Sequence, residues 1–304
     1  ESSMIDIELM SYLIDAIPEK MRLVLVGDVD QLPSVGPGNV LRDIIESGVV
    51  PVVKLTRIFR QAQDSHIIVN AHNIDEGKPI VYDNSKDSDF FFLQETDNDK
   101  IAQKVVEMVV SRLPNFTSLS PMDIQVLSPM KRSSNGVENM NKLLQAAINP
   151  TGEQIEYGTT IFRTGDKVMQ MKNDYDNDVF NGDMGTIQYV DREEGTLYVD
   201  FGKDEPVEYG KEEMKNLSLA YACTIHKSQG SEYPVVVMPF TMQFYIMLQR
   251  NLLYTGVTRA KKVCVLVGDK KAVSAAIRNG KTAKRNTMLK QRLRDTAKLY
   301  AALK

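Results

Sequence analysis

Four short polar segments follow apolar runs, which is where the side chains that do chemistry collect in open α/β sheets. They are 27–33 (GDVDQLP), 55–61 (LTRIFRQ), 224–232 (TIHKSQGSE) and 251–260 (NLLYTGVTRA). The Gln31 amide could face a phosphate or an attacking water. A guanidinium at a strand-to-helix junction, such as Arg60, suits a phosphate fork. The alternatives are a tight turn at 27–33, a surface arginine at position 60, and an Arg259 that faces the carboxyl end of a helix dipole.

The segment 224–232 combines hydroxyls, a base and an amide beside Gly230, whose missing side chain lets backbone N–H groups approach a ligand. So many polar residues between apolar runs indicate a binding loop more than a simple turn. A further loop, 128–136 (SPMKRSSNG), also follows an apolar run. From its residues alone, it is either a ligand-contacting loop or a basic surface loop.

The elements that must position these segments alternate between two periodicities. Apolar runs at 22–27, 49–55, 90–94, 124–129, 235–239 and 263–268 predict strands. Segments with helical apolar spacing lie between them, at 39–47, 61–76, 98–112, 136–148 and 245–257, and the C-terminal stretch is also expected to be helical. Strands that alternate with helices predict an α/β fold with a parallel sheet.

The rhythm changes between about 155 and 216, where short alternating runs are separated by turn signals such as NGD at 181–183 and EEG at 193–195. We predict a small all-β unit of about five strands. The α/β pattern resumes after it, so this unit is an insertion. Residues 166–216 hold 14 Asp and Glu against 6 Lys and Arg, which argues against phosphate binding by the unit as a whole.

The composition, with 42% apolar and 25% charged residues in 304, is that of about two globular domains without a membrane span. The two cysteines lie in apolar runs, so we expect buried free thiols and a reducing cytoplasm. None of the three histidines has a partner at metal-ligand spacing, so no metal site is expected. The net charge is −3, yet residues 270–304 hold 11 Lys and Arg and one acid, either a phosphate-binding segment or a solvated helix.

Taken in order and wording, GDVDQLPSV, LTRIFRQ, TIHKSQGSE and YTGVTRA resemble the later motifs of superfamily 1 helicases, and most closely the RecD/TraA family of 5′-to-3′ DNA helicases. The resemblance implies RecA-like motor domains with ATP between them and an SH3-like insertion in the second. It implies three units: residues 1–54 in the first motor domain, residues 55–154 and 217–304 in the second, and residues 155–216 as the insertion.

The resemblance also implies roles for particular residues. Glu1 would orient the attacking water, Gln31 would sense the γ-phosphate, and Arg60 and Arg259 would act as arginine fingers on the transferring phosphoryl group. Gly27, Asp28, Gly230 and Glu232 would contact the nucleotide. The implied contacts with single-stranded DNA are Ser128, Lys131, Asn135, Thr224, His226 and Ser228.

The chain departs from that pattern in one respect, because it holds no G-x-x-x-x-G-K-[ST] phosphate-binding loop. We therefore expect a C-terminal fragment of a longer protein that uses ATP and Mg²⁺, with neither bound tightly here and little ATPase alone. Two alternatives stay open: a superfamily 1 RNA helicase, and a non-catalytic module that holds nucleic acid while the acidic β unit docks a protein. The motor could also be fused to a conjugative relaxase or embedded in a nuclease complex.

Overall fold

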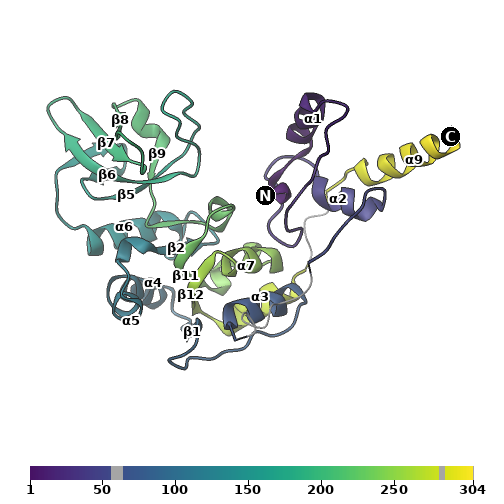
Figure 1. Ribbon diagram of the computed structural model, residues 1–304. Coiled ribbons are helices and arrows are strands. Elements are labelled where there is room, and N and C mark those ends of the chain that lie inside the picture. The colour runs from purple at the N-terminus through teal and green to yellow at the C-terminus, as the bar shows by residue number, and fades with distance from the viewer. Residues whose placement is uncertain (56–63, 281–284, 304) are drawn as a thin grey trace.

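A computed structural model describes residues 1–55, 64–280 and 285–303 (Figure 1). Its centre is a five-stranded, all-parallel sheet in the order β1-β12-β11-β2-β10. The strands are β1 (Phe90–Gln94), β2 (Ile124–Ser128), β10 (Ala222–Thr224), β11 (Tyr233–Phe240) and β12 (Ala260–Gly268). The strands predicted at 90–94, 124–129, 235–239 and 263–268 are thus confirmed.

Helices cover both faces of this sheet, as a parallel sheet requires. They are α3 (His66–Asp75), α4 (Asn98–Glu107), α6 (Val137–Ile148), α7 (Arg250–Val257) and α8 (Lys270–Arg278). Alternate residues of β11 point to opposite faces, so that Val235 and Val237 pack with α4 and α6, whereas Val236 and Met238 pack with α3, α7 and α8. The strand is therefore buried on both sides, which explains its uninterrupted apolar sequence.

The remaining helical turns are short. The predicted helix 98–112 continues through a π-helical turn (Met108–Arg112) into α5 (Leu113–Thr117). The 3-10 turns are η1 (Ser2–Met4), η4 (Pro121–Asp123), η5 (Glu213–Asn216), η6 (Ile225–Ser228) and η7 (Met242–Met247). The helix predicted at 245–257 begins only at Arg250, because the 3-10 turn η7 precedes it.

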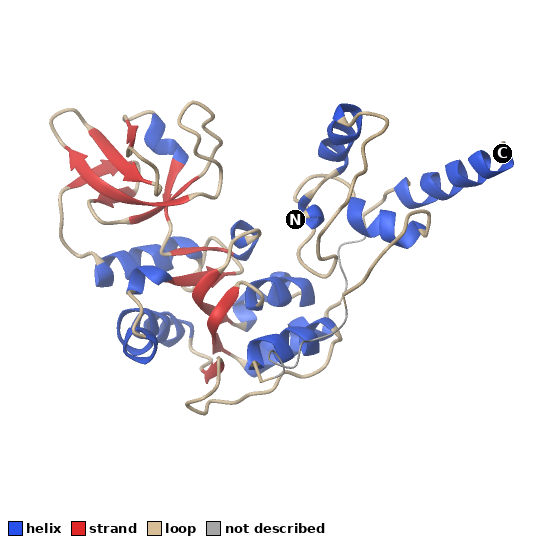
Figure 2. Ribbon diagram, in the orientation of Figure 1, coloured by secondary structure: helices blue, strands red, loops and turns tan. Residues whose placement is uncertain are grey.

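The inserted β unit is also confirmed. Its antiparallel sheet has the order β8-β7-β6-β5-β9, and a separate hairpin pairs β3 with β4 (Figure 2). The strands are β3 (Gln154–Tyr157), β4 (Thr160–Arg163), β5 (Lys167–Gln170), β6 (Met184–Asp191), β7 (Thr196–Asp200), β8 (Val207–Tyr209) and β9 (Leu217–Leu219). The turn at 193–195 joins β6 to β7 as predicted, whereas 181–183 closes a longer loop between β5 and β6.

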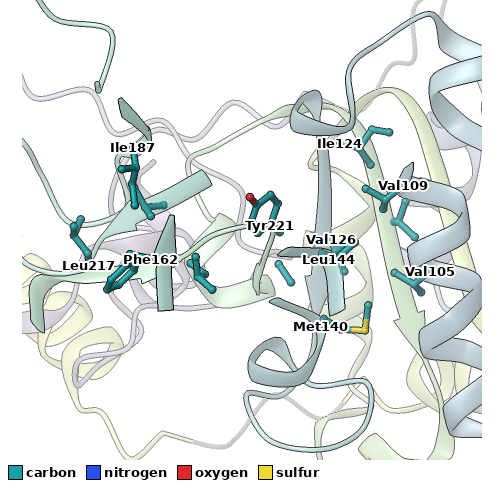
Figure 3. Packing of buried hydrophobic residues seen from close by; sticks show 14 of the residues in the cluster. Val105, Val109, Ile124, Val126, Met140, Leu144, Phe162, Ile187, Leu217 and Tyr221 are labelled. Atoms are coloured by element: carbon teal, nitrogen blue, oxygen red, sulfur yellow. The ribbon is translucent and has the colours of Figure 1, made fainter. Parts of the chain in front are cut away.

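The insertion and the parallel sheet share one continuous core. Figure 3 shows Tyr221 with Phe162 and Leu217 of the insertion on one side and Val126 of β2 on the other. The Tyr221 hydroxyl donates to the buried Asp166 carboxylate at 2.9 Å. Asp166 accepts further hydrogen bonds from Gln145, Asn149 and the backbone of Arg163, while burial raises its pKa. The insertion is therefore fixed to α6 rather than tethered by loops.

The N-terminal region has two helices, α1 (Ile7–Ala16) and α2 (Val40–Ser47), with α2 confirming the helix predicted at 39–47. The strands predicted at 22–27 and 49–55 are wrong, since both segments are extended but unpaired within the described chain. Val24, Val26, Val53 and Leu55 have exposed fractions of 79%, 72%, 88% and 91%. An apolar run becomes a buried strand only where a neighbouring strand supplies hydrogen bonds, and none of those described does so.

The C-terminal helix α9 (Leu289–Ala302) does not follow α8 onto the parallel sheet. It packs against α2, so the end of the chain lies beside its N-terminal region (Figure 1). Residues 285–302, which the predicted domain layout places in the second motor domain, therefore make their contacts with residues 34–47.

Candidate nucleotide and nucleic-acid site

The Gln31 loop is organised by the Asp28 carboxylate. One oxygen of Asp28 accepts from the Asp30 backbone N–H at 3.0 Å. The other accepts from the Gln31 side-chain amide at 3.3 Å and from the Tyr254 hydroxyl at 2.8 Å. Asp28 thus links the Gln31 amide to helix α7, and the burial of Tyr254 beside Asp28 raises the pKa of that phenol.

Gly27 lets the N-terminal residues cross close to this loop. The Ser2 backbone N–H donates to the Val26 carbonyl at 2.9 Å. A Cβ at position 27 would lie 2.9 Å from the Ser3 nitrogen, closer than side chains approach backbone. Ser3 and Gln31 both line one small cavity of about 10 Å³, and the Ser3 hydroxyl and the Gln31 side-chain carbonyl oxygen are buried without a partner among the residues described. Glu1 itself is exposed.

Leu32 fixes the Gln31 loop to helix α7 and to the apolar cluster on the parallel sheet. Its side chain is 4% exposed and lies in the apolar cluster that contains Ile225, Leu253 and Val257. Its backbone N–H donates to the Thr255 hydroxyl at 2.9 Å, and its carbonyl accepts from the Gln229 amide at 2.7 Å. Three of the polar segments, 27–33, 224–232 and 251–260, therefore meet here.

Arg259 follows α7 and is 5% exposed. Its guanidinium donates to the Ser231 carbonyl at 3.1 Å, and the buried Nε has no acceptor in the described chain. The neighbouring Glu232 is half exposed and pairs with Lys261 at 2.9 Å, which lowers the pKa of the Glu232 carboxyl. Arg60, the other expected arginine finger, lies outside the described residues.

The position of α7 depends on Gly256. A Cβ at this position would overlap the Met238 sulfur of β11, so a larger residue at 256 requires the buried Met238 side chain or the helix to move. The close approach places Thr255 and Tyr254 on one side, against the Gln31 loop. Gly230 has a φ of +80°, a conformation that favours glycine, and no atom lies within 4 Å of the place where a side chain would begin.

A polar cleft of about 170 Å³ lies beside the Tyr254–Asp28 contact. Its lining residues are Asp30, Arg42, Asp75, Arg250, Asn251, Tyr254, Asn279 and Gly280. Burial and the nearby Asp30 raise the pKa of Asp75. No group of three or more metal-ligating side chains occurs in the part of the chain that the structure describes.

The candidate DNA contacts divide into buried and accessible side chains. Ser128, Asn135 and Ser228 are fully buried, and Ser128 and Ser228 bond loop carbonyls at 2.8 Å. Thr224 accepts from the Lys227 backbone N–H and so begins η6. Burial lowers the pKa of His226, which favours its neutral form. These residues shape the two loops.

The accessible charges at these loops are lysines. Lys131 is exposed and lies close enough to Lys227 for its charge to lower the pKa of Lys227, after the larger effect of partial burial. The Lys227 ammonium donates to the Asn181 side chain of the β unit at 2.6 Å. Two cations therefore lie where the loops 128–136 and 224–232 meet the insertion.

Three family profiles match the chain: the ATP-dependent RecD-like DNA helicase SH3 domain at residues 140–201, the UvrD-like helicase C-terminal domain at 219–267, and an AAA domain at 1–96. The chain is 36% identical over 294 residues to the ATP-dependent RecD2 DNA helicase of Deinococcus radiodurans, which covers 97% of the chain and 39% of that protein. It is 29% identical to the RecBCD enzyme subunit RecD of Mycobacterium tuberculosis, over 97% of the chain and 53% of that protein.

The chain belongs to the RecD-like helicases. It spans 39% and 53% of the length of these two relatives. Among solved structures, a Pif1 helicase from Bacteroides with ADP-AlF3 and single-stranded DNA aligns with a TM-score of 0.45 and 18% identity, over 91% of this chain and 66% of that one. In this RecD-like chain, strands β10, β11 and β12 of the parallel sheet lie within or at the end of the match to the UvrD-like helicase C-terminal domain, and strands β3 to β7 of the insertion lie within the match to the RecD-like SH3 domain.

Sequence reasoning missed several contacts of this RecD-like site. Tyr254, Thr255, Gln229 and Leu32 hold the Gln31 loop against the second part of the molecule, although all four stand inside the motifs that carried the resemblance. Their phenol, hydroxyl, amide and alkyl groups could have suggested that these residues make contacts. Only the fold shows which partner each one has. Within the described residues, no helix is long and apolar enough to cross a membrane.

Proposed function

We propose that this chain is the C-terminal motor portion of an ATP-driven helicase that moves 5′-to-3′ on single-stranded DNA. The observation that carries the proposal is the junction at Leu32, because it joins the Gln31 loop to the segments that hold Gln229 and Arg259. In this proposal, Gln31 and Glu1 orient the attacking water, and Arg60 and Arg259 stabilise charge on the phosphoryl group. Gly27, Asp28, Gly230 and Glu232 shape the nucleotide contacts.

Arg259 is proposed to change partner during the cycle. In the structure, its guanidinium is held by the Ser231 carbonyl and keeps one N–H unused. A triphosphate between the Gln31 loop and Arg259 would offer anionic oxygens, which bind a guanidinium more strongly than a neutral carbonyl does. ATP binding would then tighten the cleft, and hydrolysis would release it, moving the DNA-contacting loops.

The test is Arg259→Ala in the full-length protein. We expect ATP turnover to fall by about 10³-fold or more, with single-stranded DNA affinity within about twofold of wild type. Arg259→Lys should also be inactive, since one ammonium cannot replace the planar fork, and it keeps the buried charge. Arg278→Ala, at an exposed arginine of α8, is the matched control. Wild-type turnover in Arg259→Ala would refute the assignment.

Lys131 and Lys227 are proposed to contact the DNA backbone, with Ser128, Asn135, Thr224, His226 and Ser228 holding their loops in shape. Each lysine that contacts a phosphate contributes about one unit to the slope of log affinity against log salt. Lys131→Ala with Lys227→Ala should therefore weaken binding of a random-sequence oligonucleotide and flatten that slope. Forked DNA and RNA duplexes with a 5′ or a 3′ tail would separate the polarity and the RNA-helicase alternative.

A second candidate applies to the 304 residues by themselves. Because their sequence contains no G-x-x-x-x-G-K-[ST], we propose that this chain alone binds single-stranded DNA without hydrolysing ATP. Mg²⁺ and ATP would act in the longer protein. DNA-stimulated ATPase by the purified 304-residue chain would contradict this part, and it would leave the roles of Gln31 and Arg259 to be tested as above.

A further inference from the structure

The loop that follows Gln31 is held from the far end of the chain. Helix α8 belongs to the core of the parallel sheet, where Ala272, Val273 and Ala276 are fully buried. Residues 285–302, in contrast, lie against residues 34–47, and α9 runs beside α2 away from the sheet (Figure 1). Gly280 lines the polar cleft beside the Tyr254–Asp28 contact, and the described chain resumes with Arg285 against residues 34–38.

The contact is centred on Arg285. Its Nη1 donates to the carbonyls of Gly36 and Gly38 at 2.7 and 2.6 Å and lies 3.2 Å from the Ser34 hydroxyl. Its Nη2 donates to the Ser34 carbonyl at 2.6 Å. A loop that turns several carbonyls toward one point needs a compact set of donors, and a guanidinium supplies them in a fixed plane.

A second set of contacts ties α9 to α2. Arg294 donates to the carbonyls of Ser47 and Glu46 at 3.0 and 2.7 Å, and so satisfies the last turn of α2. Lys290 pairs with Glu46 at 2.7 Å, which is the main reason that the pKa of Glu46 is lowered. Arg285 therefore holds the loop 34–38, and side chains of α9 hold helix α2, which follows that loop.

This helix and loop lead directly to Gln31. Arg42 of α2 donates to the Val29 carbonyl at 2.5 Å and pairs with Asp30 at 3.4 Å. Ser34 and Gln31 line the same cavity of about 10 Å³ as Ser3, so a shift of the loop at Ser34 changes the space that the Gln31 amide faces. Of the contacts beside Gln31, those at Ser34 are made directly by Arg285, and those of Arg42 come from the helix against which α9 packs.

We infer that Arg285 is a positioning residue for Gln31, holding the loop 34–38 so that the Gln31 amide keeps its orientation toward the reacting phosphate. The inference rests on the proposed role of Gln31. It assigns Arg285, Lys290 and Arg294 of the basic C-terminal segment, whose function the sequence left open, to internal contacts with residues 34–47. Because the segment continues from α8, it also connects the sheet that positions Arg259 to the loop that holds Gln31.

The first arm of the test is amide hydrogen exchange in the 304-residue chain. We expect Arg285→Ala to speed exchange in residues 31–47 by about tenfold, because local opening no longer breaks the guanidinium contacts. Arg292→Ala, at an exposed position on α9, removes the same charge from the same segment and should leave this exchange unchanged. Wild-type exchange in Arg285→Ala would overturn the inference.

The second arm is steady-state ATPase of the full-length protein. Misplacing a group that orients the attacking water lowers kcat more than it raises KM, so Arg285→Ala should lower kcat by about tenfold with KM for ATP within about twofold. Arg285→Lys should recover part of kcat, since an ammonium can donate to some of the same carbonyls. If Gln31→Ala is inactive but Arg285→Ala keeps a wild-type kcat, the inference about Arg285 is overturned and the proposed role of Gln31 is not. A wild-type kcat in Gln31→Ala would remove the proposed role of Gln31 and this inference with it, even if the exchange of residues 31–47 had changed.

Discussion

The Tyr254 hydroxyl joins helix α7 to the loop that holds Gln31. It donates to a carboxylate that also holds the Gln31 amide, and hydrogen bonds to charged groups contribute about 1.5–3 kcal/mol. Tyr254→Phe keeps the ring and removes this bond. We expect the free energy of unfolding of the 304-residue chain to fall by about that amount, measured by urea titration.

The matched control is Tyr245→Phe, because the Tyr245 side chain is 69% exposed. Removing its hydroxyl should leave the midpoint of urea-induced unfolding unchanged. An unchanged midpoint in Tyr254→Phe would mean that the contact contributes nothing to holding the loop against α7.

Residue types marked the segments that meet at Leu32 but did not reveal the partner of each side chain. The resemblance assigned Ser128, Asn135 and Ser228 to DNA contact, and the structure buries all three within their own loops. Small hydroxyl and amide groups bond neighbouring backbone as readily as a ligand, so sequence alone cannot separate the two uses. Lys131, whose long side chain carries a charge that resists burial, is exposed as a DNA contact should be.

At the element scale, the junction between β1 and α4 predicts a pH dependence. Glu95 accepts from the Lys104 ammonium and from the backbone of Thr96 and Asp97, and these contacts lower the pKa of its carboxyl to about 2. A lowered folded pKa means that the stabilisation is present above the ordinary glutamate pKa and is lost as pH falls towards 2. We expect Glu95→Gln to lose stability relative to wild type near neutral pH, and this difference to shrink below about pH 4.5. Thermal unfolding between pH 2 and 7 would show it, and a difference that is constant over this range would contradict it.

A second element-scale prediction concerns the packing of α7 on β11. Adding a methyl group in Gly256→Ala forces it against the Met238 sulfur, and such overpacking costs about 1–3 kcal/mol. The variant should unfold at lower urea concentration and bind ATP-state analogues less well in the full-length protein, because α7 precedes Arg259. Shortening the opposing side chain in Gly256→Ala with Met238→Val should restore part of the stability. A double variant that is less stable than Gly256→Ala would reject the overlap as the cause.

Strands whose neighbouring strands and covering helices belong to the described chain were predictable from the sequence, and strands without such neighbours were not. The runs at 235–239 and 263–268 became strands because each has neighbours on both edges or helices on both faces. The runs at 22–27 and 49–55 have equally apolar sequences, yet they are unpaired among the residues described. Strand formation is decided by partners far along the chain or on another segment, which local periodicity does not contain.

At the scale of the whole molecule, the C-terminal segment shows the same limit. Its basic composition predicted either phosphate contact or a solvated helix. No residue of α9 is buried, so the helix is solvated, and Arg285, Lys290 and Arg294 in addition contact carbonyls and a carboxylate of residues 34–47. The contact joins positions about 250 residues apart, as the separation of 247 for Arg294 and Ser47 shows. Only the folded chain brings them together.

The two exposed apolar segments give the last prediction. Single exposed apolar residues are ordinary, but several along one extended segment favour association with other apolar surface. Val24 and Val53 are 79% and 88% exposed within such segments, so the 304-residue chain should self-associate and bind a hydrophobic dye. Val24→Asn with Val53→Asn should lower both, as measured by sedimentation and dye fluorescence. Val35→Asn, at an equally exposed valine (87%) outside the two segments, should change neither. Equal effects of the two sets of substitutions would show that the segments are no more adhesive than the rest of the surface.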